Sequence, residues 1–335
     1  MFEILLIALL AIIVGTNDAA NVFGSAVGSK MLKFGFAIIF FFIFIIIGAI
    51  INAKYPSSIY QNLLVSYPIF NEIYLVLVPV IIITLISLKL KIPSSISQSI
   101  IFSLFGFALA KSFNFEYNLF YKLIYFWIAT PIIAFILSIF FCYIIQIVFK
   151  IFKLNVFQID YQIRLSLIFF GCLAAFALGS NLTASIVGIY SPYLNLDISF
   201  FNSIITVNET ILYIFGSFLI GLGALIFSQR IVQSVGSQIS TIKPVSALAI
   251  LLTQIIILLS FSSDFLIQKI NIIFPFEVFA MPLSASHITF AGIIGVASFN
   301  KFREVQPTHT MKIIISWFLI PCSVFILSYL ISLIF

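Results

Sequence analysis

Charged residues are scarce in this sequence, at 8% of 335 residues. A soluble globular domain has about a quarter of its residues charged, so this composition excludes that class. The three cysteines, Cys142, Cys172 and Cys322, all lie in apolar runs without CxxC spacing. We therefore expect neither a disulfide framework nor a cysteine metal site. With only two histidines and no HExxH or GxSxG motif, the chain has little acid–base capacity, which argues against an intramembrane enzyme.

Apolar residues fill most of the chain, at 63%, and the mean hydropathy is +1.27. Segments such as FGFAIIFFFIFIIIGAII (34–51) are long enough to cross a bilayer as a helix. The sequence thus predicts an all-α, polytopic membrane protein of about ten to twelve transmembrane segments. Candidate spans are 2–29, 34–53, 73–88, 93–110, 123–149, 165–190, 204–228, 244–262, 281–299 and 312–335.

The connecting stretches alternate in charge. One set is basic: Lys30, Lys33, Lys89, Lys91, Lys150, Lys153, Arg164, Arg230, Lys243, Lys301 and Arg303. The other set is of mixed charge and comprises 54–72, 111–122, 191–203 and 263–280. The positive-inside rule places the basic set in the cytoplasm and both termini outside, in a plasma-membrane protein. This bias also explains the net charge of +6 without invoking nucleic acid.

Two pairs of spans, 73–110 and 244–299, are open to a second interpretation as re-entrant hairpins, each entering and leaving by one face. Lys89 and Lys91 favour a full crossing, because a hairpin would hold them at membrane depth, where each charge costs at least about 2.5–3.5 kcal/mol.

Two motifs recur in the same order in the two halves. GTNDAANVFG (15–24) aligns without gaps on GSNLTASIVG (179–188), and PSSISQ (93–98) aligns on PLSASH (282–287). The charge bias runs the first span inward and 165–190 outward, so the sequence predicts two inverted repeats, 1–150 and 151–335. Many secondary transporters are built in this way and bind substrate and coupling ions near the midplane.

The motifs contain residues suited to ions. Their glycines, among them Gly15 and Gly179, are expected to let the helices open at membrane depth. Pro93 and Pro282 are each followed by serines at an expected helix start, where free amides and hydroxyl donors suit an anion. Asp18, with Asn17 and Asn181, offers oxygen ligands and one negative charge for Na+ or a proton. Small residues in apolar helices also serve helix packing, which is the competing explanation for Gly24 and Gly28.

The stretch 15–30 resembles the signature of the inorganic phosphate transporter (PiT) family, in which a Gly-x-Asn-Asp-x-Ala-Asn core runs on to Gly-Ser-Lys. PLSASH and the segment 216–236 resemble further family motifs. The resemblance implies an inverted-repeat helical homodimer that moves phosphate with Na+ or H+ and needs no cofactor. It implies that the substrate is bound by Asn17, Asn21, Ser95, Ser97, Gln98, Ser284, Ser286 and His287. It implies that the cation is bound by Asp18, Asn17, Asn181 and Ser185, with Na+ at Asp18 and Asn181.

The sequence departs from the family pattern in its second motif. Where the family has Asn-Asp and a later Asn, this chain has Asn181, Leu182 and Ser185, so one carboxylate is lost. A sulfate permease, an uncoupled anion facilitator and a non-transporting receptor are therefore alternatives. We prefer phosphate, because the carboxylate of Asp18 can accept a hydrogen bond from a protonated phosphate oxygen, which sulfate lacks near neutral pH.

Overall fold

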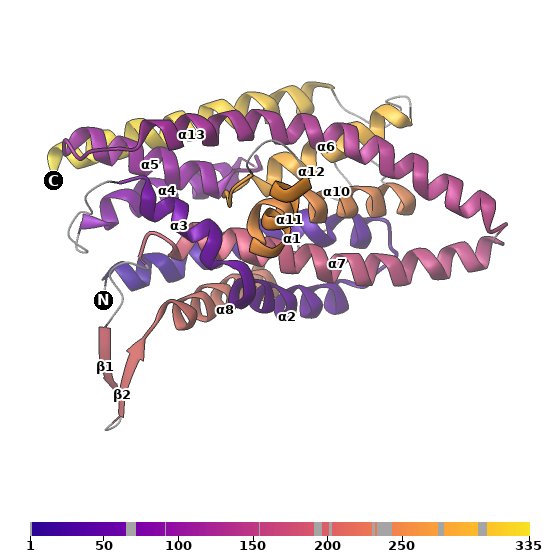
Figure 1. Ribbon diagram of the computed structural model, residues 1–335, viewed down its shortest axis with the longest axis horizontal. Coiled ribbons are helices and arrows are strands. Elements are labelled where there is room, and N and C mark those ends of the chain that lie inside the picture. The colour runs from indigo at the N-terminus through magenta and orange to yellow at the C-terminus, as the bar shows by residue number, and fades with distance from the viewer. Residues whose placement is uncertain are drawn as a thin grey trace.

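The computed structural model describes residues 2–64, 72–90, 92–153, 155–190, 196–200, 203–229, 232, 243–273, 278–300 and 307–335. Two long helices, α6 (Tyr117–Ile151) and α13 (Pro307–Ile334), run along one side of the molecule (Figure 1). The opposite side holds α2 (Phe34–Asn52), α7 (Val156–Val187) and α8 (Glu209–Phe227). Both termini lie at the same end of the molecule. The side of the membrane that this end faces stays a prediction.

Helices make up nearly all of the described chain, and the predicted all-α fold is confirmed. The remaining helices are α1 (Phe2–Gly28), α3 (Lys54–Asn62), α4 (Tyr74–Lys89), α5 (Ile96–Ala110), α10 (Pro244–Ser262), α11 (Asp264–Ile273) and α12 (Ala285–Phe299). Seven of the described helices are long and apolar enough to span a membrane, and α4, α5 and α12 are shorter apolar helices. The chain is therefore a multi-pass membrane protein.

Helix boundaries follow the hydropathy closely, with two local exceptions. The start of α7 lies nine residues before the predicted span, because Asn155 and Gln158 form a capping box that satisfies its first amides. A two-stranded antiparallel ribbon, β1 (Leu196–Phe200) and β2 (Ser203–Val207), precedes α8 and projects from the end that holds the N-terminus (Figure 1). The predicted span 204–228 includes most of β2, because the apolar residues of this strand continue into the apolar run of α8.

Two helical hairpins fill the space between the two sides. We call α4, residues 90–95 and α5 the first hairpin, with residues 93–95 as its tip. The second hairpin comprises α10, α11 and α12, with residues 282–284 as its tip. The first hairpin is too short to cross a bilayer twice, since 15 or 16 residues of helix rise about 22–24 Å against a hydrocarbon core of about 30 Å.

The lengths of α4 and α5 therefore support the re-entrant interpretation of the first hairpin. The Lys89 side chain is exposed, so the protein does not enclose its charge, and the depth of this side chain in the membrane stays a prediction. Lys91 lies outside the described residues, as do Arg230, Lys301 and Arg303 of the basic set, and part of the segment 216–236.

The largest helix contacts between the two halves of the chain each have a counterpart in which the equivalent helices of the two halves change places. Helix α1 packs on α8, and α7 packs on α2; α5 packs on α13, and α12 packs on α6. Gly15 of α1 lies against the carbonyl group of Ile220 in α8, and Gly179 of α7 lies against that of Ile45 in α2. This exchange is expected of two copies of one unit related by a twofold axis. The orientation of the copies in the membrane stays a prediction.

A third repeat in the sequence follows the same exchange. The pattern W-x-x-x-P-x-x-x-F-I-L-S occurs in α6, from Trp127 to Ser138, and again in α13, from Trp317 to Ser328. Gly295 of α12 lies against the carbonyl of Phe135, and Gly106 of α5 lies against that of Phe325. Each hairpin thus packs along the repeat copy that belongs to the other half of the chain, so the two halves interlock.

The glycines of the first motif have a different role from the one expected. Helix α1 is continuous from Phe2 to Gly28, and α7 is continuous through Gly179, so the helices do not open at these motifs. Gly15 and Gly179 instead allow two helix backbones to approach, which is the usual role of small residues in membrane helices. The described chain is not helical at residues 92–95 and 278–284, which include Pro93 and Pro282, where helix breaks were expected.

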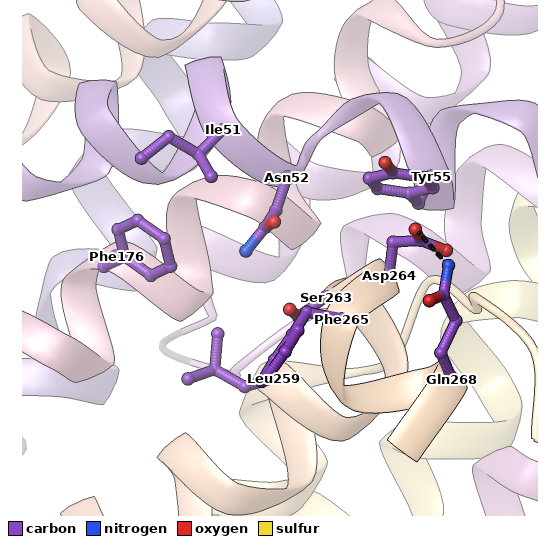
Figure 2. Close-up of a pocket in the computed structure, with 9 residues that line it drawn as sticks. All are labelled: Ile51, Asn52, Tyr55, Phe176, Leu259, Ser263, Asp264, Phe265 and Gln268. Carbon is purple, nitrogen blue, oxygen red and sulfur yellow. Dashed lines mark hydrogen bonds between the residues drawn. The ribbon is translucent and has the colours of Figure 1, made fainter. Parts of the chain in front are cut away.

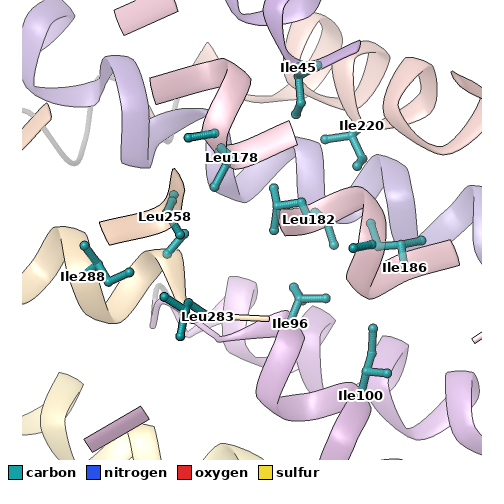
Figure 3. Packing of buried hydrophobic residues seen from close by; sticks show 14 of the residues in the cluster. Ile45, Ile96, Ile100, Leu178, Leu182, Ile186, Ile220, Leu258, Leu283 and Ile288 are labelled. Carbon is teal, nitrogen blue, oxygen red and sulfur yellow. The ribbon is translucent and has the colours of Figure 1, made fainter. Parts of the chain in front are cut away.

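Among the described residues, buried hydrophobic side chains form one cluster around the tips (Figure 3). Figure 3 shows Leu178 and Leu182 of α7, Ile45 of α2 and Ile220 of α8 among its members. Leu182, where the family pattern has a carboxylate, is 3% exposed and belongs to this cluster.

The loops fall into two groups that match the charge pattern. The Nη1 atom of Arg164 donates to the carbonyl of Met31 over 2.8 Å, which joins two stretches of the basic set. A bridge between Leu64 and Phe115, and a bond of 2.9 Å from the amide of Glu116 to the carbonyl of Leu63, join two stretches of the mixed set. The predicted grouping is consistent with these contacts. Glu277, a charged residue in the 263–280 stretch of the mixed set, lies outside the described residues.

Candidate functional site

A carboxylate is enclosed in the middle of α1. The Asp18 side chain is 3% exposed, and its Oδ1 atom accepts hydrogen bonds from Nδ2 of Asn21 at 2.6 Å and Nδ2 of Asn17 at 3.3 Å. The first motif places these three residues on adjacent positions of one helical turn. Amide donors stabilise the carboxylate form of this side chain, the form that can bind a cation or take up a proton.

Asn181 lies on α7 at the position that aligns with Asn17. Its carboxamide makes two hydrogen bonds to the backbone of Leu283 in the second tip: Nδ2 donates to the carbonyl oxygen at 2.7 Å, and Oδ1 accepts from the amide at 2.8 Å. Both groups of the amide are thus used by the tip. No hydrogen bond joins Asn181 to Asp18 in the part of the chain that the structure describes, so the expected shared cation site is not assembled in this conformation.

A network of hydroxyl groups links α7 to both tips. Ser185 accepts a hydrogen bond from Tyr60 of α3 at 2.7 Å, lies 3.0 Å from the Ser97 hydroxyl, and donates to the carbonyl of Asn181 at 3.0 Å. Ser97 also contacts the carbonyl of Leu283 at 3.1 Å. Ser185 was expected at the cation site and Ser97 at the oxyanion site. In the structure the two side chains instead contact each other.

The two tips also bring two helix N-termini together. Ser95 and Ser284 occupy the N-cap positions of α5 and α12. Ser284 bonds the amide of His287 and lies 3.3 Å from the Ser286 hydroxyl, and Ser286 donates across to the carbonyl of Ser94 at 3.5 Å. The buried hydroxyls of Ser94 and Ser95 have no partner among the described residues. Free donors at two facing helix starts can bind an oxyanion.

The side chains of Gln98 and His287 line a pocket that these serines do not line. Their side chains approach each other, with Nε2 of Gln98 3.4 Å from Nδ1 of His287. They line an apolar pocket of about 310 Å³ whose other walls come from α6 and α13. The His287 ring stacks on Trp317, with 4.1 Å between ring centroids. Of the residues expected around the oxyanion, Gln98 and His287 thus line this pocket, and the four serines do not.

A larger pocket, of about 460 Å³, contains none of the predicted site residues. It lies between α2, α3, α7, α10 and α11, and Figure 2 shows Asn52, Tyr55 and Asp264 around it. The Asp264 carboxylate accepts from Nε2 of Gln268 at 2.8 Å. No lysine or arginine is among the described residues that line the pocket, and its acidic group would repel an anion. We therefore place the candidate site at the hairpin tips.

Sequence reasoning missed four residues that contact the tips or their network: Tyr60, Trp127, Leu283 and Trp317. The repeated tryptophan pattern of α6 and α13 could have identified Trp127, whose Nε1 atom donates to the carbonyl of Pro282 at 3.0 Å. No sequence pattern indicates Tyr60, because Tyr60 and Ser185 are 125 positions apart in the chain and only the fold brings them together.

The model of the phosphate transporter family matches this chain over residues 14–159 and 153–328. The chain belongs to the phosphate transporter family. It is a member of a family of transporters and not of an enzyme family, as the sequence predicted.

Two curated relatives and one solved structure are similar along nearly the whole of this family member. A protein of Methanocaldococcus jannaschii named a phosphate permease is 24% identical over 332 residues, covering 98% of this chain and 96% of its own. A Bacillus subtilis protein named a low-affinity inorganic phosphate transporter is 28% identical over 311 residues, covering 90% and 87%. A solved structure named "The sodium-dependent phosphate transporter" matches with a TM-score of 0.76 at 17% identity, covering 100% and 99%, and so shares the fold.

Proposed function

We propose that this phosphate transporter family member is a secondary active transporter that imports inorganic phosphate across the plasma membrane in symport with Na+ or H+. The family and the names of its relatives support phosphate as the substrate. Sodium as the coupling ion is supported by the similar solved structure, whose name describes a sodium-dependent transporter.

The observation that carries this proposal is the meeting of two helix N-termini inside the bundle. Helices α5 and α12 both start there, and buried hydroxyls of Ser94 and Ser95 lack partners among the described residues. The free amides of a helix start and its dipole favour negative charge, and an oxyanion has the acceptor oxygens to use such donors. A tetrahedral oxyanion between the two tips would satisfy these hydroxyls, which have no partner among the described residues.

Asp18 supplies the basis for coupling. Helix α1, which carries it, contacts both α7 and α12, so its charge lies in the elements that surround the tips. A carboxylate and an oxyanion repel each other strongly in a medium of low dielectric constant. A cation or proton bound at Asp18 removes that repulsion, so each ion raises the affinity for the other. This reciprocal effect is the thermodynamic requirement for symport.

Phosphate rather than sulfate is favoured by hydrogen-bond chemistry. Near neutral pH phosphate keeps a P–O–H group that can donate to a carboxylate, whereas sulfate offers only acceptors. Asp18 is an acceptor of this kind, and Ser95 and Ser97 can serve the remaining oxygens as donors.

Uptake into proteoliposomes tests the proposal. Purified protein is reconstituted, and entry of labelled phosphate and labelled sulfate is measured with an imposed Na+ gradient, an imposed proton gradient, or neither. We expect phosphate to accumulate against its gradient with at least one ion. Preference for sulfate would identify sulfate as the substrate. Uptake that does not depend on either gradient would indicate an uncoupled facilitator. Binding without flux would indicate a receptor.

The proposed assembly is a homodimer with both termini outside. The exposed apolar side chains of α6 and α13 are numerous, as lipid contact or a partner subunit requires. Cross-linking in native membranes tests the dimer, and protease access to a terminal tag in intact cells tests the orientation.

A further inference from the structure

Four residues occupy equivalent places in the two halves around the hairpin tips. Asn17 in α1 aligns with Asn181 in α7, and Trp127 in α6 aligns with Trp317 in α13. The tips align as well, with Pro93-Ser94 corresponding to Pro282-Leu283. If the two halves had identical conformations, each tip would receive the same hydrogen bonds.

The second tip receives the full set. Trp127 donates from Nε1 to the carbonyl of Pro282 at 3.0 Å. Asn181 holds both the amide and the carbonyl of Leu283, at 2.8 and 2.7 Å, and the Ser97 hydroxyl reaches the same carbonyl at 3.1 Å. We call this set of contacts the clasp of the second tip.

The first tip lacks its counterpart. The buried Nε1 atom of Trp317 has no partner among the described residues, where symmetry would give it the carbonyl of Pro93. Asn17 makes no described contact with Ser94 and donates to Asp18 instead. Of the equivalent bonds, the described residues make only the one from Ser286 to the carbonyl of Ser94, at 3.5 Å, the outer limit for a hydrogen bond.

The residue after each asparagine gives a physical reason for this asymmetry. Asn17 is followed by Asp18, whose carboxylate competes for the amide of Asn17. Asn181 is followed by Leu182, whose side chain offers no hydrogen-bond partner and is buried in the hydrophobic cluster. The clasp of the second tip therefore has no competitor at the residue next to its asparagine.

We propose that the two clasps alternate during transport: the structure shows the second tip clasped and the first released, and the opposite state clasps the first tip and releases the second. In that state Trp317 bonds the carbonyl of Pro93, and Asn17 bonds the backbone of Ser94. The inference rests on the proposed transport function and assigns Trp127, Trp317, Asn17 and Asn181 as positioning residues of the tips.

Contacts in the structure oppose a clasp at the first tip in the present state. The Trp317 ring is stacked on His287 of the second hairpin at 4.1 Å, so it must leave that ring to turn its N–H toward Pro93. Asn17 must likewise leave Asp18. Each change on the first tip thus requires the loss of a contact that belongs to the present state, which is how a bistable element behaves.

The chain offers a direct spectroscopic test, because Trp127 and Trp317 are its only tryptophans. Protein labelled with 15N-tryptophan in lipid nanodiscs gives two indole N–H signals, assigned with Trp127→Phe and Trp317→Phe. Without ligand, we expect the Trp127 proton to have the downfield shift of a hydrogen-bonded group and the Trp317 proton not to. A Trp127 proton without that shift would overturn the assignment of the present state.

Reciprocity is the decisive result. Trp127→Phe removes the indole N–H and should move the Trp317 signal toward the hydrogen-bonded position. The population of the opposite state should rise by about 2- to 10-fold, which corresponds to the free energy of one hydrogen bond. Trp317→Phe should move the Trp127 signal further toward the bonded position. Asn181→Ala, which leaves both indoles in place, should act in the same direction as Trp127→Phe. The proposal would be refuted if the indole signals that remain in each of the three variants had the same positions as in the wild-type protein.

This test separates the inference from the proposed function. It is made without substrate or coupling ion, so failure of reciprocity leaves phosphate uptake untouched. Conversely, a protein that exchanges its clasps but transports no phosphate would contradict only the substrate. In wild-type protein, Na+ with phosphate should shift the two indole signals in opposite directions; shifts in the same direction would count against alternation.

Discussion

Gly15 of α1 lies so close to the peptide carbonyl of Ile220 in α8 that a β-carbon at position 15 would overlap it. The Gly179–Ile45 pair between α7 and α2 repeats this relationship. The hydroxyls follow the same pattern: Thr16 donates to the carbonyl of Gly223 at 3.3 Å, and Ser180 to that of Gly48 at 3.0 Å. The four helices that carry the two motifs and their partners are thus held backbone to backbone.

Gly15→Ala and Gly179→Ala should each destabilise the protein by about 1–3 kcal/mol, because the backbones must separate to admit the methyl group. The measurement is thermal unfolding in detergent. Gly35→Ala is the matched control, since a β-carbon there meets nothing within 4 Å. Alanine at position 35 should be neutral or stabilising by up to about 1 kcal/mol. Equal effects at all three positions would show that close approach is not the reason for these glycines.

Asn181→Ala should reduce phosphate uptake by at least about tenfold. The substitution leaves the amide and carbonyl of Leu283 without the carboxamide, at a cost of about 1–3 kcal/mol for each buried group left unpaired, and frees the second tip. Initial rates in proteoliposomes provide the measurement. Asn62→Ala, at an exposed position of α3, is the control and should retain full uptake. Normal rates in the Asn181 variant would show that the clasp is dispensable.

Asp18→Asn should abolish uptake driven by an ion gradient, with a loss of at least about 100-fold. The substitution keeps the size of the side chain but removes the charge that holds the coupling cation. Asp160→Asn is the control: this exposed carboxylate pairs with Arg164 at 2.8 Å, an interaction that contributes at most about 1 kcal/mol. Retention of gradient-driven accumulation in the Asp18 variant would defeat the role given to this carboxylate.

Tyr60→Phe should weaken phosphate transport by about three- to tenfold, mainly through KM. The variant keeps the ring but loses the bond to Ser185, which shares its network with Ser97. Concentration dependence of uptake separates KM from the maximal rate. Tyr121→Phe, on a side chain that is 64% exposed, is the matched control. Identical kinetics in the two variants would remove Tyr60 from the functional network.

The helices could be predicted from the sequence because hydrophobic thickness fixes their length and burial fixes their composition. Nine of the ten expected spans start within about six residues of a helix in the structure, and only the start of α7 moves further, to its capping box. The course of the 73–110 segment could not be predicted in this way. Hydropathy marks 73–88 and 93–110 as apolar but does not show where the helices begin and end, and the 15 or 16 residues of α4 and α5 are too few for two full crossings.

The candidate site was predicted in part. Asp18 with Asn17 and Asn21 lies where one helical turn must bring three neighbouring polar residues, and the structure shows them in contact. The expected cation site of Asn181 with Asp18 is not assembled among the described residues in this conformation, because the carboxamide of Asn181 bonds a backbone 102 residues away. Ser97 and Gln98 were expected at one site, yet adjacent residues on a helix start face different directions: Ser97 contacts Ser185, and Gln98 lines the apolar pocket. Whether these residues bind the ions stays a prediction.

The sequence alone determined which segments enter the membrane, where the charge lies, and which short motifs recur, since these depend on composition and local spacing. The tertiary structure decided what each motif contacts. Whether a glycine opens a helix or admits a neighbouring backbone, and whether an asparagine holds an ion or a hairpin tip, depends on atoms far away in the chain. Local sequence carries no record of those atoms, because the interlocking of the two halves is what brings them together.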